Sequence, residues 1–321
     1  MQKRQIGRSS LQVPVLCLGG NVFGWTVNEL DSFRLLDAAL DAGLTFIDTA
    51  DVYSRWVEGH SGGESETMLG KWFARSGRRG QVVLATKLGF EMGDGKKGLS
   101  SKYITEAVEA SLQRLKTDYI DLYQTHTDDA ETPLEETLKA FDSLVKQGKV
   151  RVIGASNYSG ARLKEAIEIS EKNHLARYEC LQPNYSLVER SAFEDDLLPV
   201  VKQYQIGVIP YFSLAAGFLT GKYRSKQDAE GKARSKMVEK YLNDRGFAVL
   251  KALDAVAAEL HSTPASVALA WLIARPGITA PIASATSLDQ LKDLVEGTQL
   301  RLPPEAIAML DAASAPAQIA A

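Results

Sequence analysis

The sequence is poor in the residues that mark metal sites, disulfide-rich domains and membrane spans. It holds 2 cysteines and 4 histidines in 321 residues, and these do not stand at the spacing of a metal site. Two cysteines are too few for a disulfide framework, so we expect Cys17 and Cys180 to be reduced core residues. No run reaches the ~18 uncharged apolar residues of a membrane helix, and the first residues lack the apolar core of a signal peptide.

The sequence also lacks an excess of charge of either sign. Its 37 Lys and Arg residues and 40 Asp and Glu residues give a formal net charge of −3. This balance predicts no basic surface for nucleic acid or for an anionic membrane. We therefore expect a soluble, cytoplasmic protein whose partner is a small molecule. Composition does not decide between a monomer and a homo-oligomer.

Short apolar runs alternate with longer amphipathic segments along most of the chain. The runs are rich in β-branched and aromatic residues, as in strands that are buried on both faces. They span residues 15–20, 44–50, 81–89, 119–126, 150–156, 178–186, 206–212 and 278–284. Eight strand–helix units predict an α/β fold of the closed (β/α)8 TIM-barrel type rather than an open sheet. Because such a barrel fills ~250 residues or more, we expect residues 1–321 to form one domain.

Two segments stand outside this alternation. Around residues 7–10, two short extended stretches flank a glycine-containing turn, which predicts an N-terminal β-hairpin that closes one mouth of the barrel. Between the seventh and eighth runs, a charged loop precedes a helical pattern near residues 244–260. This pattern predicts an extra helix inserted before strand 8.

Polar side chains follow several predicted strands at the point where each strand ends. Asp48 and Tyr53 follow the second strand, Lys87 ends the third and His126 ends the fourth. In a barrel these strand ends meet at the mouth that holds the active site. Buried Lys and Asp side chains are rare unless paired, so we expect Lys87 and Asp48 to pair.

Such a pair has a chemical use beside a tyrosine. A neighbouring cation favours the phenolate and would lower the pKa of Tyr53, while His126 would orient a substrate carbonyl by hydrogen bonding. The set therefore suits carbonyl reduction, with the proton supplied by Tyr53. Taken singly, a Lys or a His at a strand end is more often structural, and the residues alone leave both interpretations open.

The order and spacing of several segments resemble those of the aldo-keto reductase superfamily, in its bacterial and potassium-channel-β-like branch. These segments are FIDTADVY (46–53), VLATKLG (83–89), DLYQTH (121–126), GASNYS (154–159), LQPNYS (181–186) and LAAGFLTGKYR (214–224). The resemblance covers nearly the whole chain and implies reduction of aldehydes or ketones with NADPH. It implies that Tyr53 is the general acid and that Lys87 and Asp48 tune it. It also implies that His126 orients the carbonyl.

The resemblance further implies which residues hold the nicotinamide end of the coenzyme. They are Gly20, Asn21, Asp48, Ser156, Asn157, Gln182 and Tyr211. Within this set, Ser156, Asn157 and Gln182 would bind the carboxamide. Tyr211 would stack against the nicotinamide ring.

A second set would hold the phosphates and the adenine. It comprises Leu214, Ala216, Gly217, Lys222, Arg234, Ser284, Thr286, Gln290 and Asp293. Arg234 matches a position that meets the 2′-phosphate, but Gln290 stands where the family often has an arginine. Leu294 replaces an asparagine that meets the adenine, and Phe212 replaces a common serine. NADP(H) is therefore the expected coenzyme, with NAD(H) as the alternative.

Loop aromatics predict an apolar wall for the carbonyl substrate. They are Phe23, Trp25, Trp56 and Phe90. The segment GDGKKG (93–98) matches a dinucleotide-binding glycine pattern, but its first glycine comes several residues after a strand. The candidate acid, Asp118, precedes the next strand instead of ending it, so we reject a Rossmann interpretation.

Two other functions remain as alternatives. A coenzyme-binding redox sensor or regulatory subunit would keep the same residues and turn over slowly. A phosphate-binding barrel isomerase or aldolase would use Lys87 as a Schiff base. The presence of Asp48, Tyr53 and His126 around that lysine disfavours the latter.

Overall fold

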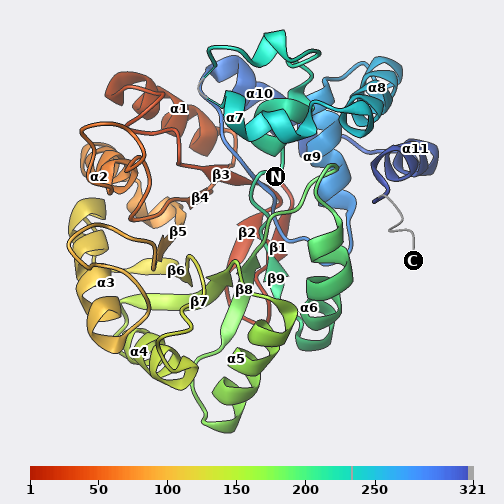
Figure 1. Cartoon of the computed structure of the whole chain (residues 1–321). Coiled ribbons are helices and arrows are strands. Elements are labelled where there is room, and N and C mark those ends of the chain that lie inside the picture. Colours follow the sequence, from red (N-terminus) through yellow and green to blue (C-terminus); the bar gives the residue numbers. More distant parts are fainter. Residues whose placement is uncertain (233, 317–321) are drawn as a thin grey trace.

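The computed structural model describes residues 1–232 and 234–316. A parallel sheet of eight strands curls into a barrel at its centre, and helices surround the sheet (Figure 1). The strand order is β10-β3-β4-β5-β6-β7-β8-β9, so the last strand returns to pair with the first strand of the barrel. The predicted (β/α)8 barrel is confirmed.

The barrel strands are short and buried, and each falls within one of the predicted runs. They are β3 (Cys17–Gly19), β4 (Phe46–Asp48), β5 (Val83–Leu88), β6 (Ile120–Thr125), β7 (Val150–Ser156), β8 (Tyr178–Gln182), β9 (Gly207–Val208) and β10 (Ile282–Ala283). The last two are much shorter than predicted, because Pro210 and Pro281 carry no backbone N–H. Thr279 N–H donates to the Val208 carbonyl at 2.8 Å, which joins the β9 and β10 segments.

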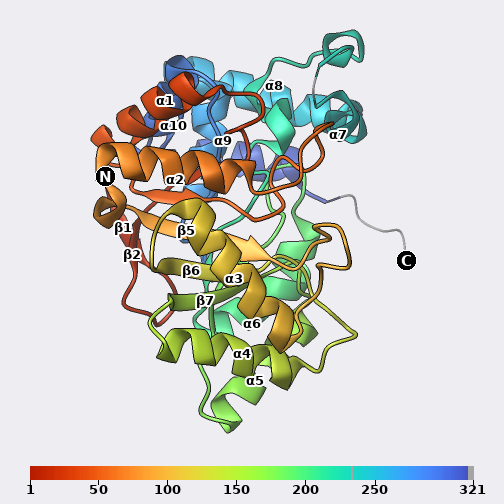
Figure 2. The ribbon, with the colours of Figure 1, turned by 90° about the vertical axis from the view of Figure 1, so that its left-hand side faces the viewer.

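One helix follows each barrel strand on the outside of the sheet. These helices are α1 (Glu29–Asp41), α2 (Glu64–Ser76), α3 (Ser101–Leu115), α4 (Leu134–Lys146), α5 (Gly160–Lys172), α6 (Leu198–Tyr204), α9 (Pro264–Ala274) and α10 (Leu288–Gly297). Asn28, Ser100 and Ser159 accept hydrogen bonds from the first turns of α1, α3 and α5, which fixes where those helices begin. Figure 2 shows α2, α3, α4 and α5 side by side along one flank of the barrel.

The hairpin predicted at the N-terminus is present. Strands β1 (Lys3–Gln5) and β2 (Gln12–Pro14) pair antiparallel. Ile6 and Val13 are fully buried in a core cluster that also contains Cys17 and Cys180, so the hairpin closes the end of the barrel where the strands begin. Both cysteines are free and buried, as predicted. In Figure 2 the hairpin and the α7 segment lie at opposite ends of the molecule.

The long connection between β9 and β10 contains the predicted extra helix, α8 (Asp244–Glu259). The connection also holds a short helix, α7 (Ser235–Val238). Short single-turn or irregular helical segments occur in this connection and elsewhere: η1 (Arg79–Gln81), the π-helix η2 (Ala192–Leu197), η3 (Ala215–Thr220), η4 (Gln227–Ala229) and η5 (Glu239–Tyr241). Among the described residues no single helix is long and apolar enough to cross a membrane. Helices α8 and α9 meet that length and composition only as a pair bent by 97°.

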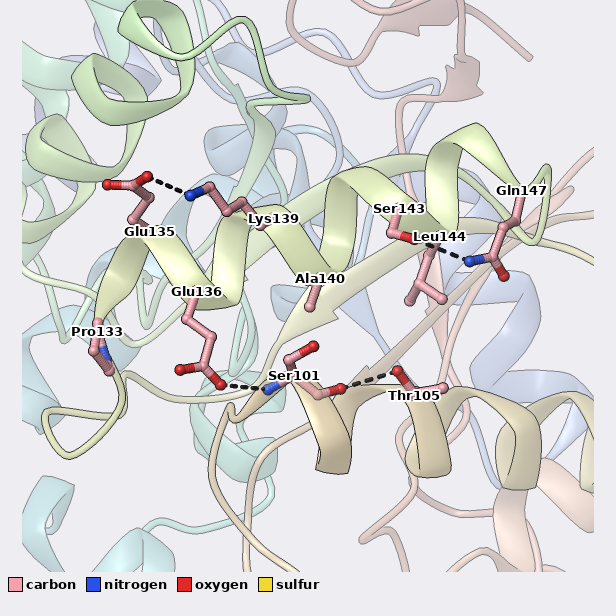
Figure 3. Close-up of a pocket in the computed structure, with 10 residues that line it drawn as sticks. All are labelled: Ser101, Thr105, Pro133, Glu135, Glu136, Lys139, Ala140, Ser143, Leu144 and Gln147. Atoms are coloured by element: carbon pink, nitrogen blue, oxygen red, sulfur yellow. Dashed lines mark hydrogen bonds and ion pairs between the residues drawn. The ribbon is translucent and has the colours of Figure 1, made fainter.

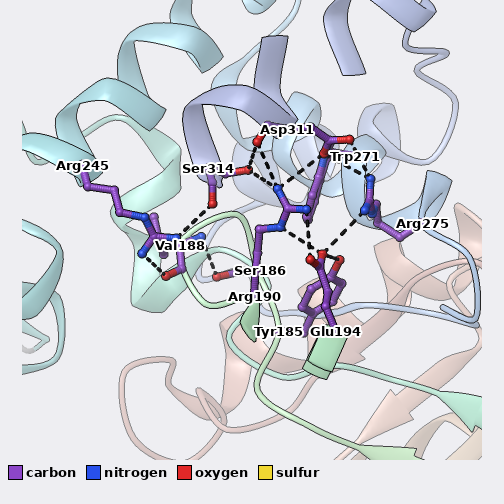
Figure 4. Close-up of polar contacts among 10 residues, drawn as sticks. All are labelled: Tyr185, Ser186, Val188, Arg190, Glu194, Arg245, Trp271, Arg275, Asp311 and Ser314. Atoms are coloured by element: carbon purple, nitrogen blue, oxygen red, sulfur yellow. Dashed lines mark hydrogen bonds and ion pairs between the residues drawn. The ribbon is translucent and has the colours of Figure 1, made fainter. Parts of the chain in front are cut away.

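A C-terminal helix that the sequence did not predict, α11 (Pro304–Ser314), packs against α8. A charged cluster anchors it (Figure 4). Asp311 accepts hydrogen bonds from Arg275 at 2.9 Å and from the indole of Trp271 at 2.8 Å, while Arg190 links Ser314 to Glu194. These partly buried bonds join α11 to α9 and to the segment after β8.

The contact between α2 and α3 yields a prediction about stability. A Cβ atom at Gly70 would lie 2.0 Å from the carbonyl oxygen of Arg114, which is backbone and cannot rotate away. Gly70→Ala should therefore lower the free energy of unfolding by about 2 kcal/mol, although alanine favours helices by ~1 kcal/mol. Denaturant unfolding followed by circular dichroism measures the change. Gly80→Ala is the control, since nothing lies within 4 Å of that position, and equal stability of the two variants would contradict this packing.

Candidate active site

Lys87 and Asp48 form a buried ion pair at the mouth of the barrel. Their side chains are 0% and 1% exposed. Lys87 Nζ donates to Asp48 Oδ1, to Asp48 Oδ2 and to the Thr49 carbonyl, each at 2.7 Å. An ammonium group has three hydrogens, so these contacts use all of them. The predicted pairing is confirmed, and each partner offsets the desolvation of the other.

Tyr53 lies directly over this pair. Its hydroxyl donates to Asp48 Oδ2 at 3.3 Å, and Lys87 Nζ is 4.8 Å from the centre of its ring. Burial raises the pKa of the Tyr53 phenol well above its ordinary value, and the charge and hydrogen bond of Asp48 raise it further. The expected lowering of this pKa by Lys87 is wrong for this arrangement, because the carboxylate is bonded to the phenol and the ammonium is not. Tyr53 therefore keeps its proton at neutral pH.

His126 faces Tyr53 from the end of β6. The two ring centres are 5.9 Å apart, and the imidazole is 9% exposed. Burial lowers the pKa of His126 well below its ordinary value, and the nearby Lys87 lowers it further. The ring is thus neutral, with one N–H to donate. Its Nδ1 is buried and has no hydrogen-bond partner among the described residues.

A buried amide, Gln124, also contacts the pair and received no role from the sequence. Its Nε2 lies 3.4 Å from Asp48 Oδ1, and Gln182 Nε2 donates to the same oxygen at 3.0 Å. Gln182 and Gln124 meet each other at 3.4 Å. The signal for Gln124 was its place two residues before His126, since alternate residues of a strand share a face. The Asp48 carboxylate thus has side-chain donors from Lys87, Tyr53, Gln124 and Gln182.

The residues predicted for the nicotinamide end gather around this centre. Ser156 Oγ donates to the Gln182 carbonyl at 2.8 Å. Asn157, in a left-handed backbone conformation with φ +58°, donates from Nδ2 to the His126 carbonyl at 2.8 Å. The Tyr211 hydroxyl donates to Asn157 Oδ1 at 2.8 Å. These bonds connect the ends of β6, β7, β8 and the segment after β9 into one polar rim.

The loops after β3 and β10 complete the rim on its other side. Ser284 Oγ donates to Asn21 Oδ1 at 2.6 Å. A Cβ atom at Gly20 would lie 3.0 Å from the Asp48 carbonyl, which explains a small residue there. Gln290 Oε1 accepts from both the N–H and the hydroxyl of Thr286 at 2.9 and 3.1 Å, so its carbonyl is directed into its own loop.

Asp293 lies further along α10 than the other predicted coenzyme residues. It is half-buried, and burial raises the pKa of its carboxyl. Its backbone carbonyl accepts a hydrogen bond from Ser266 of α9 at 2.8 Å. The contact shown for Asp293 therefore joins two helices.

A second group of predicted residues forms a cationic cluster. Burial lowers the pKa of Lys222, and the charges of Arg234 and Lys232 lower it further. Burial also lowers the pKa of Arg234. In residues 1–232 and 234–316, none of these three side chains has a carboxylate partner within ion-pair distance. Cations without a carboxylate partner suit an anion such as a phosphate.

The backbone beside this cluster is left-handed over consecutive residues. Ala215, Ala216 and Gly217 have φ of +48°, +56° and +95°. Lys222 Nζ would lie 3.0 Å from a Cβ at Gly217, so the ammonium approaches this turn closely. The N–H groups of Ala215 and Gly217 donate to the carbonyls of Phe212 and Leu214 at 2.7 and 2.8 Å, so backbone hydrogen bonds fix this turn beside the ammonium.

Three of the four aromatic side chains that were predicted to form the substrate wall lie at the mouth of the barrel, and the fourth does not. Trp56 and Phe90 are 52% and 39% exposed, and Trp25 meets Trp56 edge to face at 5.4 Å. Phe90 lies 4.4 Å from the ring of His126. Phe23, in contrast, is 0% exposed and packs in the hydrophobic core. It cannot line the pocket in this arrangement because the loop folds its ring into the core.

Two other parts of the molecule, a glycine-rich loop and a surface groove, contain none of the predicted site residues. Residues 93–98 form a turn-rich loop after β5, and α3 begins only at Ser101, so the glycines do not open a helix. A surface groove between α3 and α4 (Figure 3) has polar groups that bond mainly to one another. Glu135 pairs with Lys139, and Glu136 accepts from the Ser101 N–H. The chemistry of the fold is therefore concentrated at the barrel mouth.

A parallel barrel with a buried lysine–aspartate pair, a tyrosine and a histidine at its carboxyl-end mouth defines a class of barrel oxidoreductase. The chain belongs to the aldo/keto reductase family, whose sequence profile, "Aldo/keto reductase family", matches residues 15–315. Enzymes of this family generally use nicotinamide coenzymes. The predicted membership is confirmed.

Curated relatives match over almost their full length. "Uncharacterized oxidoreductase YrpG" of Bacillus subtilis (strain 168) is 38% identical, covering 97% of this chain and 95% of the relative. "Protein tas" of Escherichia coli (strain K12) is 33% identical, with 97% of each chain covered. "Probable voltage-gated potassium channel subunit beta" of Oryza sativa subsp. japonica is 32% identical, covering 97% of this chain and 96% of the relative.

Asp51 is a buried carboxyl near the site to which the sequence assigned no role. It is 2% exposed, and its Oδ1 has no hydrogen-bond partner among the described residues. Its backbone N–H donates to the Lys87 carbonyl at 3.1 Å, so it anchors the loop that carries Tyr53. Burial raises the pKa of Asp51 from 3.8 to about 8, and the charge of Glu66 contributes. Asp51 is therefore protonated at neutral pH.

This raised pKa predicts how stability depends on pH. Between pH 3.8 and about 8 the folded protein holds a proton on Asp51 that the unfolded chain has lost. The contribution to stability therefore falls as pH rises through this window, by up to ~1.4 kcal/mol per pH unit for one proton. Asp51→Asn should remove this slope. Denaturant unfolding at a series of pH values measures it.

Glu58→Gln is the matched control, because Glu58 is an exposed carboxyl of the same loop. That variant should keep the wild-type slope. An Asp51→Asn protein with an unchanged slope would show that Asp51 is ionised in the folded state.

Proposed function

We propose that this protein reduces aldehydes or ketones to alcohols, with NADPH as the coenzyme and Tyr53 as the proton donor. The observation that carries the proposal is the contact of the Tyr53 hydroxyl with Asp48 beside Lys87 at the open end of the barrel. A bound reduced nicotinamide would supply a hydride to the carbonyl carbon. The protein must then deliver one proton to the carbonyl oxygen.

His126 and Tyr53 divide the work at the carbonyl oxygen. The neutral imidazole of His126 donates a hydrogen bond that orients the oxygen and polarises the carbonyl. Tyr53 donates its proton as negative charge develops on that oxygen. Lys87, 4.8 Å from the Tyr53 ring centre, then stabilises the phenolate that remains. Asp48 holds Lys87 in place and accepts the hydrogen bond of the Tyr53 hydroxyl until substrate enters.

The coenzyme assignment rests on two groups of residues. Ser156, Asn157 and Gln182 present amide and hydroxyl groups beside Asp48, which suits a carboxamide. Lys222 and Arg234 are cations without carboxylate partners in the described part of the chain, which suits phosphates. The choice of NADPH over NADH depends on Arg234, because Gln290 is turned toward Thr286.

A Schiff-base role for Lys87 has less support. All three hydrogens of its ammonium are used on acceptors at 2.7 Å, and two of those acceptors carry the charge of Asp48. A nucleophilic amine needs a free lone pair, which this environment opposes. Borohydride treatment in the presence of substrate should accordingly leave Lys87 unmodified.

A regulatory role is the second candidate, favoured by the relative from rice whose name is that of a potassium-channel β subunit. Such a protein would bind the coenzyme with the same residues and reduce carbonyls slowly. Rapid mixing of the coenzyme-bound protein with an aldehyde separates the two roles. A turnover of ~1 per second or faster is typical of enzymes, and a far slower one with every carbonyl tested would favour the regulatory role.

The proton-donor assignment predicts the effect of removing one oxygen atom. Tyr53→Phe should lower kcat by about 10³-fold, since general acid catalysis contributes 10²- to 10⁴-fold. The Kd of NADPH should change by less than about twofold, because the hydroxyl bonds to Asp48 and not to the coenzyme. The absorbance of NADPH with nitrobenzaldehyde, methylglyoxal and glyceraldehyde measures the rate.

Tyr204→Phe is the matched control, because that hydroxyl bonds to Glu168 on the outside of the barrel at 3.0 Å. It should leave kcat unchanged. Equal kcat of Tyr53→Phe and wild type would contradict the assignment, while absence of coenzyme binding by fluorescence would contradict the proposed function as a whole.

Coenzyme preference supplies a further prediction. Arg234→Ala should raise the KM for NADPH at least about tenfold, the effect of losing a charge-assisted hydrogen bond, and leave the KM for NADH nearly unchanged. Arg224→Ala is the control in the same connection, because Asp254 already binds that guanidinium at 2.6 and 2.7 Å. An equal rise for both coenzymes would remove Arg234 from the 2′-phosphate site.

A further inference from the structure

Phe212 combines a strained backbone with an exposed aromatic ring. Its φ is +53°, a left-handed conformation that is unfavourable for any residue with a Cβ atom. Its side chain is 37% exposed, although Ser213, Ala215 and Ala216 beside it are buried. A glycine would adopt this backbone without strain. The fold alone therefore gives no reason for phenylalanine at this position.

The segment after Phe212 holds it rigidly. The Phe212 carbonyl accepts from the Ala215 N–H at 2.7 Å, and Ser213 Oγ donates to the Pro210 carbonyl at 3.1 Å. Ala215 and Ala216 are also left-handed. Strain that is concentrated in one short segment and fixed by its surroundings is characteristic of ligand-binding sites.

The ring stands next to the predicted nicotinamide-stacking residue. The centres of the Phe212 and Tyr211 rings are 5.2 Å apart at an interplanar angle of 68°. The Tyr211 hydroxyl is held by Asn157 at 2.8 Å, so Tyr211 is fixed at both ends. On its other side, Phe212 is followed three residues later by the left-handed turn beside Lys222, which begins at Ala215. The exposed ring thus occupies the interval between the nicotinamide and phosphate sides of the proposed coenzyme site.

We propose that Phe212 is a coenzyme-binding residue whose ring covers the nicotinamide riboside part of the coenzyme. The apolar face of the ring would contact the C–H face of the ribose, between Tyr211 and the Ala215–Gly217 turn. This inference rests on the proposed function. Because the ribose is common to both coenzymes, Phe212 contributes equally to NADPH and NADH, in contrast to Arg234.

Phe212→Gly tests this inference through two measurements that need no catalysis. The Kd of both NADPH and NADH, measured by fluorescence, should rise at least about tenfold, the loss expected for one aromatic contact. The Tm of the coenzyme-free protein should rise by roughly 1–3 °C, because glycine relieves the left-handed backbone. Phe212→Tyr keeps the ring and should keep the wild-type Kd.

Gln205→Gly is the matched control. Gln205 has φ +55°, is exposed and ends α6 away from the barrel mouth. It should raise the Tm to a similar degree with no change in either Kd. Wild-type Kd values in Phe212→Gly, a change for NADPH alone or a fall in its Tm would each overturn the inference. If the wild-type protein binds neither coenzyme, the proposed function and this inference both fail. If the wild-type protein binds tightly and Phe212→Gly has the same Kd, only the role of Phe212 is refuted.

Discussion

The ion pair between Lys87 and Asp48 is the contact on which the arrangement of the barrel mouth depends. Both side chains are buried, and removing one partner would leave an uncompensated charge in the core. Their positions follow from the sheet, because Asp48 pairs with Ala85 across β4 and β5, and Lys87 lies two residues further on the same face. Tyr53, Gln124 and Gln182 then arrange themselves around Asp48 as donors.

The two ends of the barrel serve different purposes. The end where the strands begin is closed by the hairpin and filled with apolar residues, including Ile6 and Val13. The other end holds the ion pair, a neutral His126 and exposed aromatic rings such as Trp56. Stability is thus supplied at one end and chemistry at the other. This separation permits strained residues such as Phe212 and Ala216 at the mouth without loss of the fold.

The sequence predicted the features that depend on regular patterns. All eight barrel strands lie within the apolar runs, and Lys87 was expected to pair with Asp48 because an isolated buried charge is costly. The lengths of β9 and β10 were overestimated, although Pro210 and Pro281 were visible. Helix α11 was missed although its sequence carried a signal, because Pro304 stands in its first turn and the buried Ala306, Leu310 and Ser314 recur every four residues.

Other predictions failed because they depend on properties that only the three-dimensional structure defines. The direction of the Tyr53 pKa shift depends on which charge is bonded to the phenol, and the geometry selects Asp48 over Lys87. The burial of Phe23 depends on how a loop folds back on the core. The protonation of Asp51 depends on its distance from solvent and from Glu66, which spacing along the chain does not reveal.

The protonation state of Tyr53 is the central claim of this account, and a nuclear magnetic resonance titration tests it directly. Protein labelled with ¹³C at the tyrosine Cζ, compared with Tyr53→Phe, identifies the Tyr53 signal. We expect this signal to remain at the phenol position up to pH ~10, the ordinary pKa of tyrosine, because burial and Asp48 oppose ionisation. A Tyr53 signal that moves to the phenolate position near neutral pH would contradict the account, since it would show that Lys87, and not Asp48, governs the proton.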